Sequence, residues 1–226
     1  MPSFFPSRQP SQTIKLDDHE ITATEVELLD QRRTVYRFKL SADSYRHTIP
    51  KTDASVIVKQ QKEEWEEEFD DEETAYNKLK DLQGKVIPNF YGRGYFDGQP
   101  ALILSKIDGI PLNAVARSSD CKIPEDSLKA YLEEVFTELS KHGALYHDQK
   151  LDNFLLCHDE QRGHIKVMVV DLEQVEFPDK LRPWEHLINQ EGARSLMEDF
   201  RYTRNPRREP SPLQFWMSGN NESIAQ

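Results

Sequence analysis

Two segments decide the expected fold of this chain: YHDQKLDNFLL (residues 146–156) and KVMVVDLE (residues 166–173). Asp148 and Asn153 lie in a short polar connection, and the apolar run 167–170 leads directly to Asp171. In a phosphoryl-transfer site, one carboxylate orients or deprotonates a hydroxyl group, while an amide oxygen and a second carboxylate hold Mg²⁺. The order and spacing therefore predict that Asp148 acts on a hydroxyl and that Asn153 and Asp171 share a divalent cation.

These two segments resemble the catalytic and metal-binding segments of the protein-kinase-like superfamily. The protein-kinase pattern is H-G-x-x-H-R-D-x-K-x-x-N followed by D-F-G, and it is matched here by His142, Gly143, Asp148, Lys150, Asn153 and Asp171. Tyr146 and His147 stand in place of His-Arg, and Leu172-Glu173 stands in place of Phe-Gly. The D-x-E ending also resembles choline and aminoglycoside kinases, and the short C-terminal part resembles fungal kinase-like proteins. The resemblance covers residues 56–177.

The resemblance implies an α+β, two-lobed fold: an N-terminal antiparallel sheet with one helix, and a truncated, mainly helical C-terminal lobe. It implies a phosphotransferase that uses ATP and Mg²⁺ and transfers the γ-phosphate to a hydroxyl acceptor on a protein or small molecule. Asp148 would be the catalytic base and Lys150 would steady the transferred group, while Asn153 and Asp171 would hold the metal. The implied nucleotide-binding residues are Lys59, Glu72, Leu104, Ser105 and Ile107.

The N-terminal half predicts strands at residues 21–29, 34–40 and 56–59, the last of which ends in Lys59. Residues 62–82 predict one helix whose apolar face carries Trp65, Phe69, Tyr76 and Leu79. Glu72 lies in the middle of that face, and a carboxylate that faces a core needs a partner. We expect Lys59 to be that partner; the alternative is an acidic, solvated helix with Glu72 at its margin.

One departure from the family pattern is the missing glycine-rich loop, because no glycine precedes Gly84. Backbone N–H groups of such a loop approach the nucleotide phosphates. Here the turn at residues 30–33 carries Arg32 and Arg33, which could clamp phosphate instead. Equally, the loop could leave the nucleotide untouched. Two alternatives therefore stay open: an impaired pseudokinase that binds nucleotide or a protein, and an interaction protein that uses the acidic residues 63–73.

The C-terminal half predicts a strand at residues 101–104 and, from Pro124 onward, an amphipathic helix that ends at Gly143. Residues 181–197 predict one or two short helices anchored by Trp184, Leu187, Ile188 and Leu196. The predicted division is a flexible tail (1–13), an N-terminal lobe (14–104), a hinge (105–109), a reduced helical lobe (110–200) and a basic, polar tail (201–226).

Composition narrows the classes of partner. The 226 residues carry a net charge of −11, which argues against a general nucleic-acid or anionic-membrane binder. No apolar run approaches the length needed to span a membrane. The N-terminal residues lack the continuous apolar core that a secretory signal would have. Cys121 and Cys157 show no metal-binding spacing, and Cys157 is expected to be a small buried residue. We therefore expect a cytoplasmic protein whose partners are a nucleotide and a hydroxyl-bearing acceptor.

Overall fold

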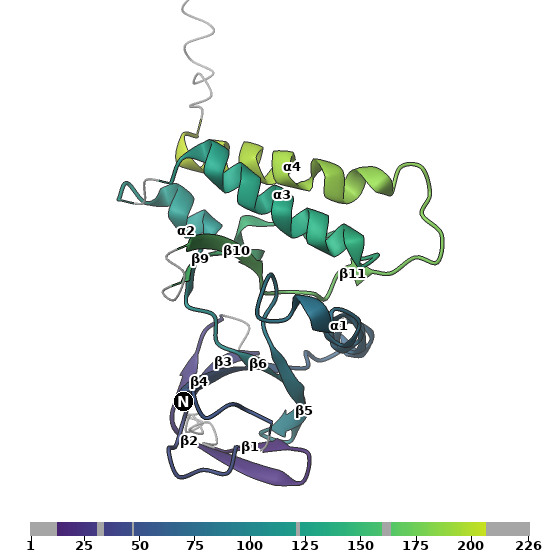
Figure 1. The fold of residues 1–226 in the computed structure, drawn as a ribbon. Helices are drawn as coiled ribbons and strands as arrows, with labels where there is room; N and C mark the ends of the chain where they lie inside the picture. Colours follow the sequence, from purple (N-terminus) through teal and green to yellow (C-terminus); the bar gives the residue numbers. More distant parts are fainter. Residues whose placement is uncertain (1–12, 31–33, 47, 121–122, 160–163, 207–226) are drawn as a thin grey trace, which may run out of the picture.

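The computed structural model describes residues 13–30, 34–46, 48–120, 123–159 and 164–206. A barrel of strands with one helix along its side makes up one end of the molecule, and a mainly helical part makes up the other (Figure 1). The predicted α+β class is confirmed. Arg32, Arg33 and Cys121, nearly all of the predicted N-terminal tail and most of the predicted C-terminal tail fall outside the described residues.

The strands of the N-terminal half form a closed antiparallel barrel in the order β1-β2-β3-β4-β6-β5. The predicted strands correspond to β2, β3, β4 and β6. The sequence did not predict β1, which closes the barrel by pairing with both β2 and β5. The bounds are β1 Thr13–Leu16, β2 His19–Leu28, β3 Val35–Leu40, β4 Ser55–Gln60, β5 Phe90–Phe96 and β6 Gln99–Ser105.

Alternation along β4 places the key lysine. Val56 and Val58 are fully buried inside the barrel, whereas Ile57 packs against the core that the barrel shares with the helices. Because side chains of a strand alternate between its two faces, Lys59 lies on the same face as Ile57. The strand therefore directs Lys59 out of the barrel, toward the helix and the second part of the molecule.

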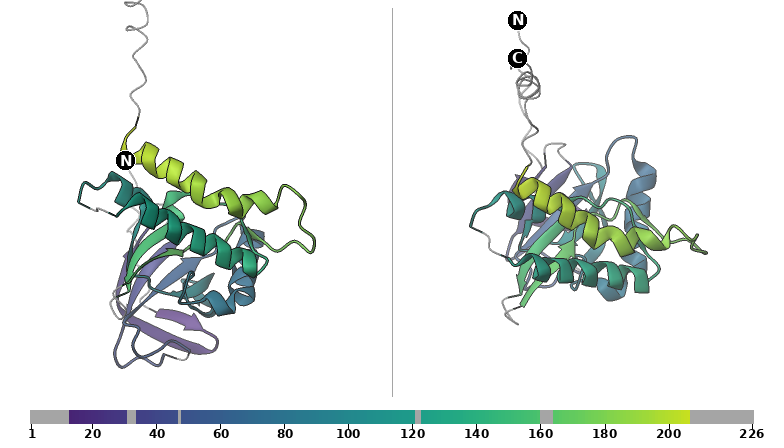
Figure 2. Two further views of the ribbon diagram at one scale, coloured as in Figure 1. Left: turned by 45° about the horizontal axis from the view of Figure 1, so that its top comes forward. Right: turned by 90° about the horizontal axis from the view of Figure 1, so that it is seen from above.

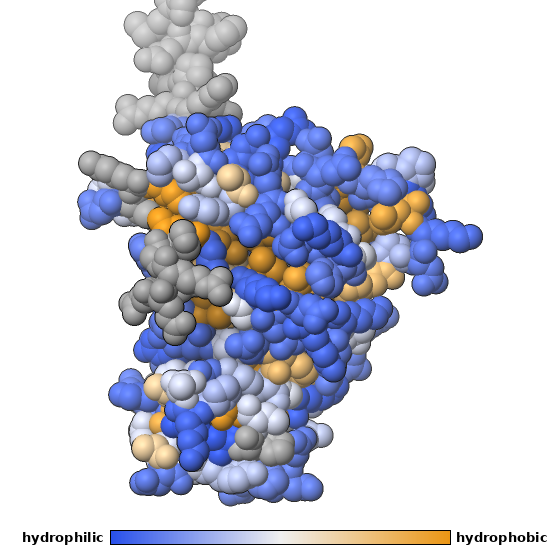
Figure 3. Space-filling model, viewed as in Figure 1, coloured by the Kyte–Doolittle hydropathy of each residue, from blue (hydrophilic) through white to orange (hydrophobic). Residues whose placement is uncertain are grey.

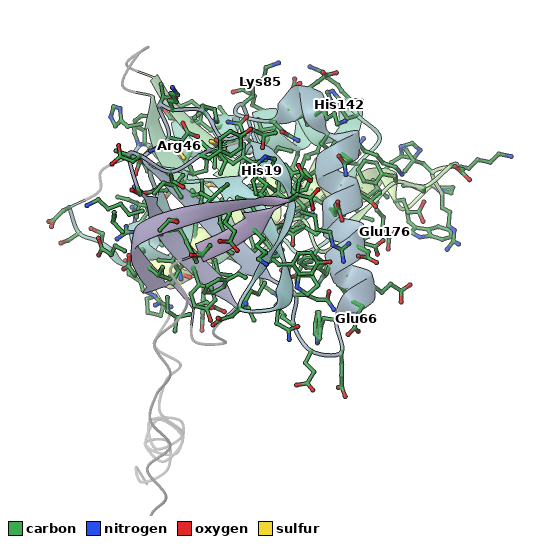
Figure 4. The ribbon with its side chains drawn as sticks, turned by 90° about the horizontal axis from the view of Figure 1, so that it is seen from below. His19, Arg46, Glu66, Lys85, His142 and Glu176 are labelled. Atoms are coloured by element: carbon green, nitrogen blue, oxygen red, sulfur yellow. The ribbon has the colours of Figure 1, made fainter. Side chains whose placement is uncertain are left out.

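Helix α1 (Glu66–Lys78) runs along the side of the barrel, with Glu66 at its start (Figure 4). The predicted helix over residues 62–82 is too long, because Glu64 adopts a left-handed backbone (φ 64°) and only a 3₁₀ turn, η1 (Lys80–Leu82), follows. Trp65 was predicted on the buried face, which is wrong: it precedes the helix and is 40% exposed. Glu72 is fully buried in the middle of that face, as predicted.

The second part combines short strands with helices. Two small sheets support it, β10-β9-β7 and β11-β8, and helices α3 and α4 lie side by side over them (Figure 2). Gly192 of α4 permits this close packing, since a Cβ there would meet the Phe136 ring of α3 at 2.5 Å. The bounds are β7 Gly109–Pro111, α2 Leu112–Arg117, α3 Glu125–Lys141, β8 Leu145–Tyr146, η2 Leu151–Asn153, β9 Phe154–Asp159, β10 His164–Val169, β11 Val175–Glu176 and α4 His186–Arg204.

Helix α4 differs from the prediction in length and in its buried face. It is a single helix that continues to Arg204, past the predicted lobe boundary at residue 200. Leu196 is buried, but Trp184 (61% exposed) and Leu187 (51% exposed) are not anchors. Leu181, in the loop before α4, is exposed as well (42%), and Figure 3 shows hydrophobic residues at the surface in the upper right of the view. No helix within the described ranges is long and apolar enough to cross a membrane.

Candidate functional site

The site is built around the ammonium group of Lys59 at the end of β4. Its Nζ lies 2.7 Å from Oε2 of Glu72, 3.1 Å from Oδ1 of Asp171 and 3.1 Å from Oε1 of Glu173. The predicted contact between Lys59 and Glu72 is therefore present. A barrel strand, helix α1 and the segment after β10 meet at this one nitrogen.

The segment that follows β10 is held to α1 by its own backbone. The Leu172 N–H donates to Oε1 of Glu72 at 3.3 Å, so both oxygens of this buried carboxylate are engaged. The Glu173 N–H donates to Oδ1 of Asp171 at 3.2 Å, which orients the carboxylate that faces Lys59. Helix α1 thus couples the barrel to the Asp171 segment through one glutamate.

Burial and charge set the ionisation of this cluster. Burial raises the pKa of Glu72 to about 7, against the opposing pull of Lys59. Burial alone would lower the pKa of Lys59, but the charges of Glu72, Asp171 and Glu173 together raise it above its ordinary value. Burial would raise the pKa of Asp171, yet Lys59 and the Glu173 N–H hold it below its usual range. The site therefore contains a permanently charged lysine and an ionised Asp171 at neutral pH.

Glu173 also binds a second lysine that the sequence analysis did not single out. Nζ of Lys62 lies 2.6 Å and 2.8 Å from the two oxygens of Glu173. In the sequence resemblance Glu173 takes the place of the glycine of D-F-G, and a largely buried acid needs a cation nearby. Lys62, three positions after Lys59, was the available signal in the sequence.

The loop that carries Asp148 is closed by two contacts to its carboxylate. Nζ of Lys150 lies 2.6 Å from Oδ1, and Nδ2 of Asn153 donates to Oδ2 at 2.8 Å and to the Asp148 carbonyl at 3.0 Å. The Val170 N–H donates to the Asn153 carbonyl at 3.0 Å, which brings this loop beside Asp171. The structure therefore places Asp148, Asn153 and Asp171 in one neighbourhood, although they come from two separate segments.

Asn189 of α4 anchors the same loop, and sequence reasoning missed it. This asparagine is 3% exposed; its Oδ1 accepts from the Tyr146 N–H at 3.1 Å, and its Nδ2 donates to the Ala144 carbonyl at 2.7 Å and to Oγ of Ser140 at 2.9 Å. Its position on the apolar stripe of α4, one turn before Gly192, was the signal that could have revealed it. A buried amide on such a stripe needs hydrogen-bond partners.

Two buried tyrosines flank the cluster. Tyr76 of α1 stacks on Phe90, and Tyr146 packs edge-on against Phe154. Burial, with the nearby carboxylates adding to it, raises the pKa of both phenols well above the ordinary value. Both phenols therefore stay neutral beside the carboxylate cluster. Nε2 of His147, which the sequence resemblance aligns with an arginine, lies 3.3 Å from Oε2 of the exposed Glu176.

The predicted nucleotide-base region lies at the end of β6. Leu104 and Ser105 are buried, and Ile107 is half-buried. The Ser105 N–H donates to the Asn89 carbonyl at 2.9 Å, and Oγ of Ser105 accepts from the Asn89 N–H at 2.9 Å. The Ser105 N–H is already hydrogen-bonded to Asn89. Backbone hydrogen bonds to a nucleotide base would therefore have to come from the residues that follow Ser105, Ile107 among them.

The oxygen donors of the site suit a hard divalent cation. Glu72, Asp171 and Glu173 each have one carboxylate oxygen within 4.8 Å of the others, but in this structure Lys59 contacts all three carboxylates. Since Nδ2 of Asn153 is bound to Asp148, Oδ1 is its remaining ligand atom. Mg²⁺ prefers such oxygen ligands and needs only one or two carboxylates when phosphates complete its shell. Asn153 and Asp171, the two ligands that the sequence predicts, therefore offer oxygen atoms of the kind that Mg²⁺ binds.

Comparison with known proteins supports the fold. No family model matches the chain, and no curated protein matches its sequence. Among solved structures, a mutant form of the Mycobacterium tuberculosis PknI kinase domain superposes with a TM-score of 0.57 at 14% identity, covering 82% of this chain and 75% of that one. The fold is kinase-like. A double-mutant form of the same domain gives a TM-score of 0.55 at 15% identity, covering 88% and 81%. At this identity the likeness concerns the fold alone.

Proposed function

We propose that this chain is an ATP- and Mg²⁺-dependent phosphotransferase that transfers the γ-phosphate of ATP to a hydroxyl acceptor. The observation that carries the proposal is the contact of one buried ammonium, Lys59, with both Glu72 of α1 and Asp171 after β10. Phosphoryl transfer depends mainly on positioning and charge neutralisation, so a fixed cation beside a metal-binding carboxylate is its central requirement.

The remaining roles follow from the positions around that contact. Lys59 binds the α- and β-phosphates, and Glu72 keeps its side chain in place. Asp148 accepts the proton of the acceptor hydroxyl, and Lys150, 2.6 Å away, steadies the charge of the transferred phosphoryl group. Asn153 and Asp171 hold Mg²⁺, which neutralises charge on the phosphate oxygens when it is bound. The adenine base of the nucleotide lies against Leu104 and Ile107.

The test combines binding with turnover. Mg·ATP at one hundred times its dissociation constant should stabilise the folded chain by about 2.7 kcal/mol, which thermal melting detects. ATP consumption, measured with pooled hydroxyl-bearing acceptors, should fall on the order of 100-fold or more in Asp148→Asn, as loss of a general base predicts. Asp171→Asn should lose turnover as well. Equal turnover by the wild type and both variants would reject the proposal.

The second candidate is a pseudokinase that keeps the fold and a nucleotide or protein site without catalysis. Two observations favour it: Glu173 contacts Lys59 where a phosphate is expected to bind, and no glycine precedes Gly84 to form a phosphate-covering loop. It predicts a melting shift with nucleotide and no ATP consumption above that of the Asp148→Asn variant.

A further inference from the structure

Two lysines share one carboxylate oxygen at the centre of the site. Oε1 of Glu173 lies 3.1 Å from Nζ of Lys59 and 2.6 Å from Nζ of Lys62. Both lysines and Glu173 are largely withdrawn from water, with side-chain exposures of 8%, 16% and 13%. Two ammonium groups that contact the same oxygen form a binding site for an anionic oxygen atom. In this structure Oε1 of Glu173 occupies that site.

The position of Lys62 is set by its surroundings. Its ammonium lies 5.0 Å from the centre of the Trp65 ring, a cation–π contact that holds the side chain on the side of the cluster. The left-handed residue Glu64 turns the chain between Lys62 and the start of α1. Lys62 is thus a fixed cation, unlike the freely moving lysine of an exposed loop.

The positive charge of Lys62 also suits it to bind phosphate. Phosphate oxygens carry negative charge and accept hydrogen bonds from ammonium groups in the same way as carboxylate oxygens. The chain also lacks glycines in the β2–β3 turn, where backbone N–H groups of a glycine-rich loop would otherwise meet the phosphates. A second lysine beside Lys59 supplies hydrogen-bond donors and positive charge where such a loop would supply backbone N–H donors.

We propose that Lys62 is a second phosphate-binding lysine, and that the Glu173 carboxylate occupies the place that a phosphate oxygen takes when nucleotide binds. This inference rests on the proposed function, because it names a further ligand-binding residue of the same site. On binding, the phosphate replaces Glu173 as the shared partner of Lys59 and Lys62, and the Glu173 carboxylate turns away from both.

Calorimetric titration of the full chain with ATP and with adenosine tests the role of Lys62. Lys62→Ala should weaken ATP binding about 10-fold to 100-fold, the usual effect of losing one hydrogen bond to a charged group. Adenosine, which lacks phosphate, should bind this variant as it binds the wild type. Lys62→Arg should retain ATP affinity within about threefold, and Lys80→Ala, an exposed lysine on η1, should behave as the wild type. Melting curves establish that each variant is folded.

Glu173→Gln tests the second half of the proposal in Mg²⁺-free buffer. The amide keeps the shape of the side chain but removes the charge that competes with phosphate, so ATP should bind more tightly, by about threefold or more. Unchanged or weaker binding overturns the claim that Glu173 stands in for phosphate.

The outcomes separate the two proposals. If the wild type fails to bind ATP, the proposed function and the role of Lys62 both fall. If the wild type binds ATP and folded Lys62→Ala binds it equally well, only the role of Lys62 is overturned. Loss of ATP affinity that is matched by an equal loss of adenosine affinity also overturns it, because the effect would then be independent of phosphate.

Discussion

Replacing Lys59 by methionine is the sharpest perturbation of the site, because it removes the one cation on which three carboxylates converge. Methionine preserves most of the length and apolar surface of the lysine stem, so the change mainly deletes charge. Glu72 is then left fully buried with no ammonium beside it. Asp171 is partly exposed, and Glu173 keeps Lys62, so both carboxylates lose less.

The expected cost depends on pH. Removing one partner of a buried ion pair costs about 3–5 kcal/mol; we expect about 3 kcal/mol for Lys59→Met at pH 8, where wild-type Glu72 is largely ionised. At pH 5 we expect about 1 kcal/mol, since Glu72, whose pKa is raised by burial to about 7, already carries a proton there. Adding Glu72→Gln to Lys59→Met should recover much of the loss at pH 8, because the amide is neutral.

Urea denaturation followed by circular dichroism measures these differences at both pH values, with Lys80→Met as the control for an exposed lysine. The total stability of a domain is about 5–15 kcal/mol, so the variant should remain folded and measurable. A cost below about 1 kcal/mol at pH 8, or an equal cost at pH 5 and pH 8, would refute the reasoning that Lys59 compensates a buried charge on Glu72.

Three further changes test other parts of the structure. The free energy of unfolding of the wild type should fall by up to about 3 kcal/mol as pH rises from 4.5 to about 7, because the folded chain keeps the Glu72 proton that the unfolded chain releases; denaturation across this range should show no such slope in Glu72→Gln. Asn189→Ala should cost about 1–3 kcal/mol by leaving buried groups unpaired, and hydrogen exchange should show a less protected Tyr146 amide; unchanged protection would contradict the anchoring role. Gly192→Ala should cost about 1–3 kcal/mol in melting experiments, since its Cβ would overlap the Phe136 ring, and a neutral result would show that α3 and α4 can separate freely.

Local patterns in the sequence predicted much of the barrel and the buried position of Glu72, whereas the pairing of Glu72 with Lys59 was expected from the family resemblance. Helical periodicity placed Glu72 on the buried face of α1, whereas the alternation along β4 that directs Lys59 toward it was seen only in the structure. The length of α1 was not predictable by periodicity alone, because Glu64 leaves the helical conformation while its neighbours continue the acidic pattern. Trp65 was misplaced for the same reason.

The helical end of the chain was harder to predict, because burial there depends on a partner helix. Trp184 and Leu187 are large apolar residues of the kind that anchor a core. The face of α4 that meets α3 begins only at Asn189, however, and leaves both of them exposed. Apolar residues are often found at protein surfaces, so composition could not distinguish an anchor from an exposed side chain. The buried amide at Asn189 was overlooked because its partners, the backbone of Ala144 and Tyr146 and the Ser140 hydroxyl, lie more than forty residues away along the chain.

The order and spacing of Asp148, Asn153 and Asp171 could be read from the amino-acid sequence alone. They were sufficient to predict the catalytic and metal-binding segments, because each segment is short and its local geometry is limited. Only the tertiary structure decided that β1 closes the barrel and that Glu173 joins Lys59 to Lys62. The physical reason is that local spacing specifies the face of an element on which a side chain lies. Which charges meet across two faces depends on how elements more than a hundred residues apart pack together.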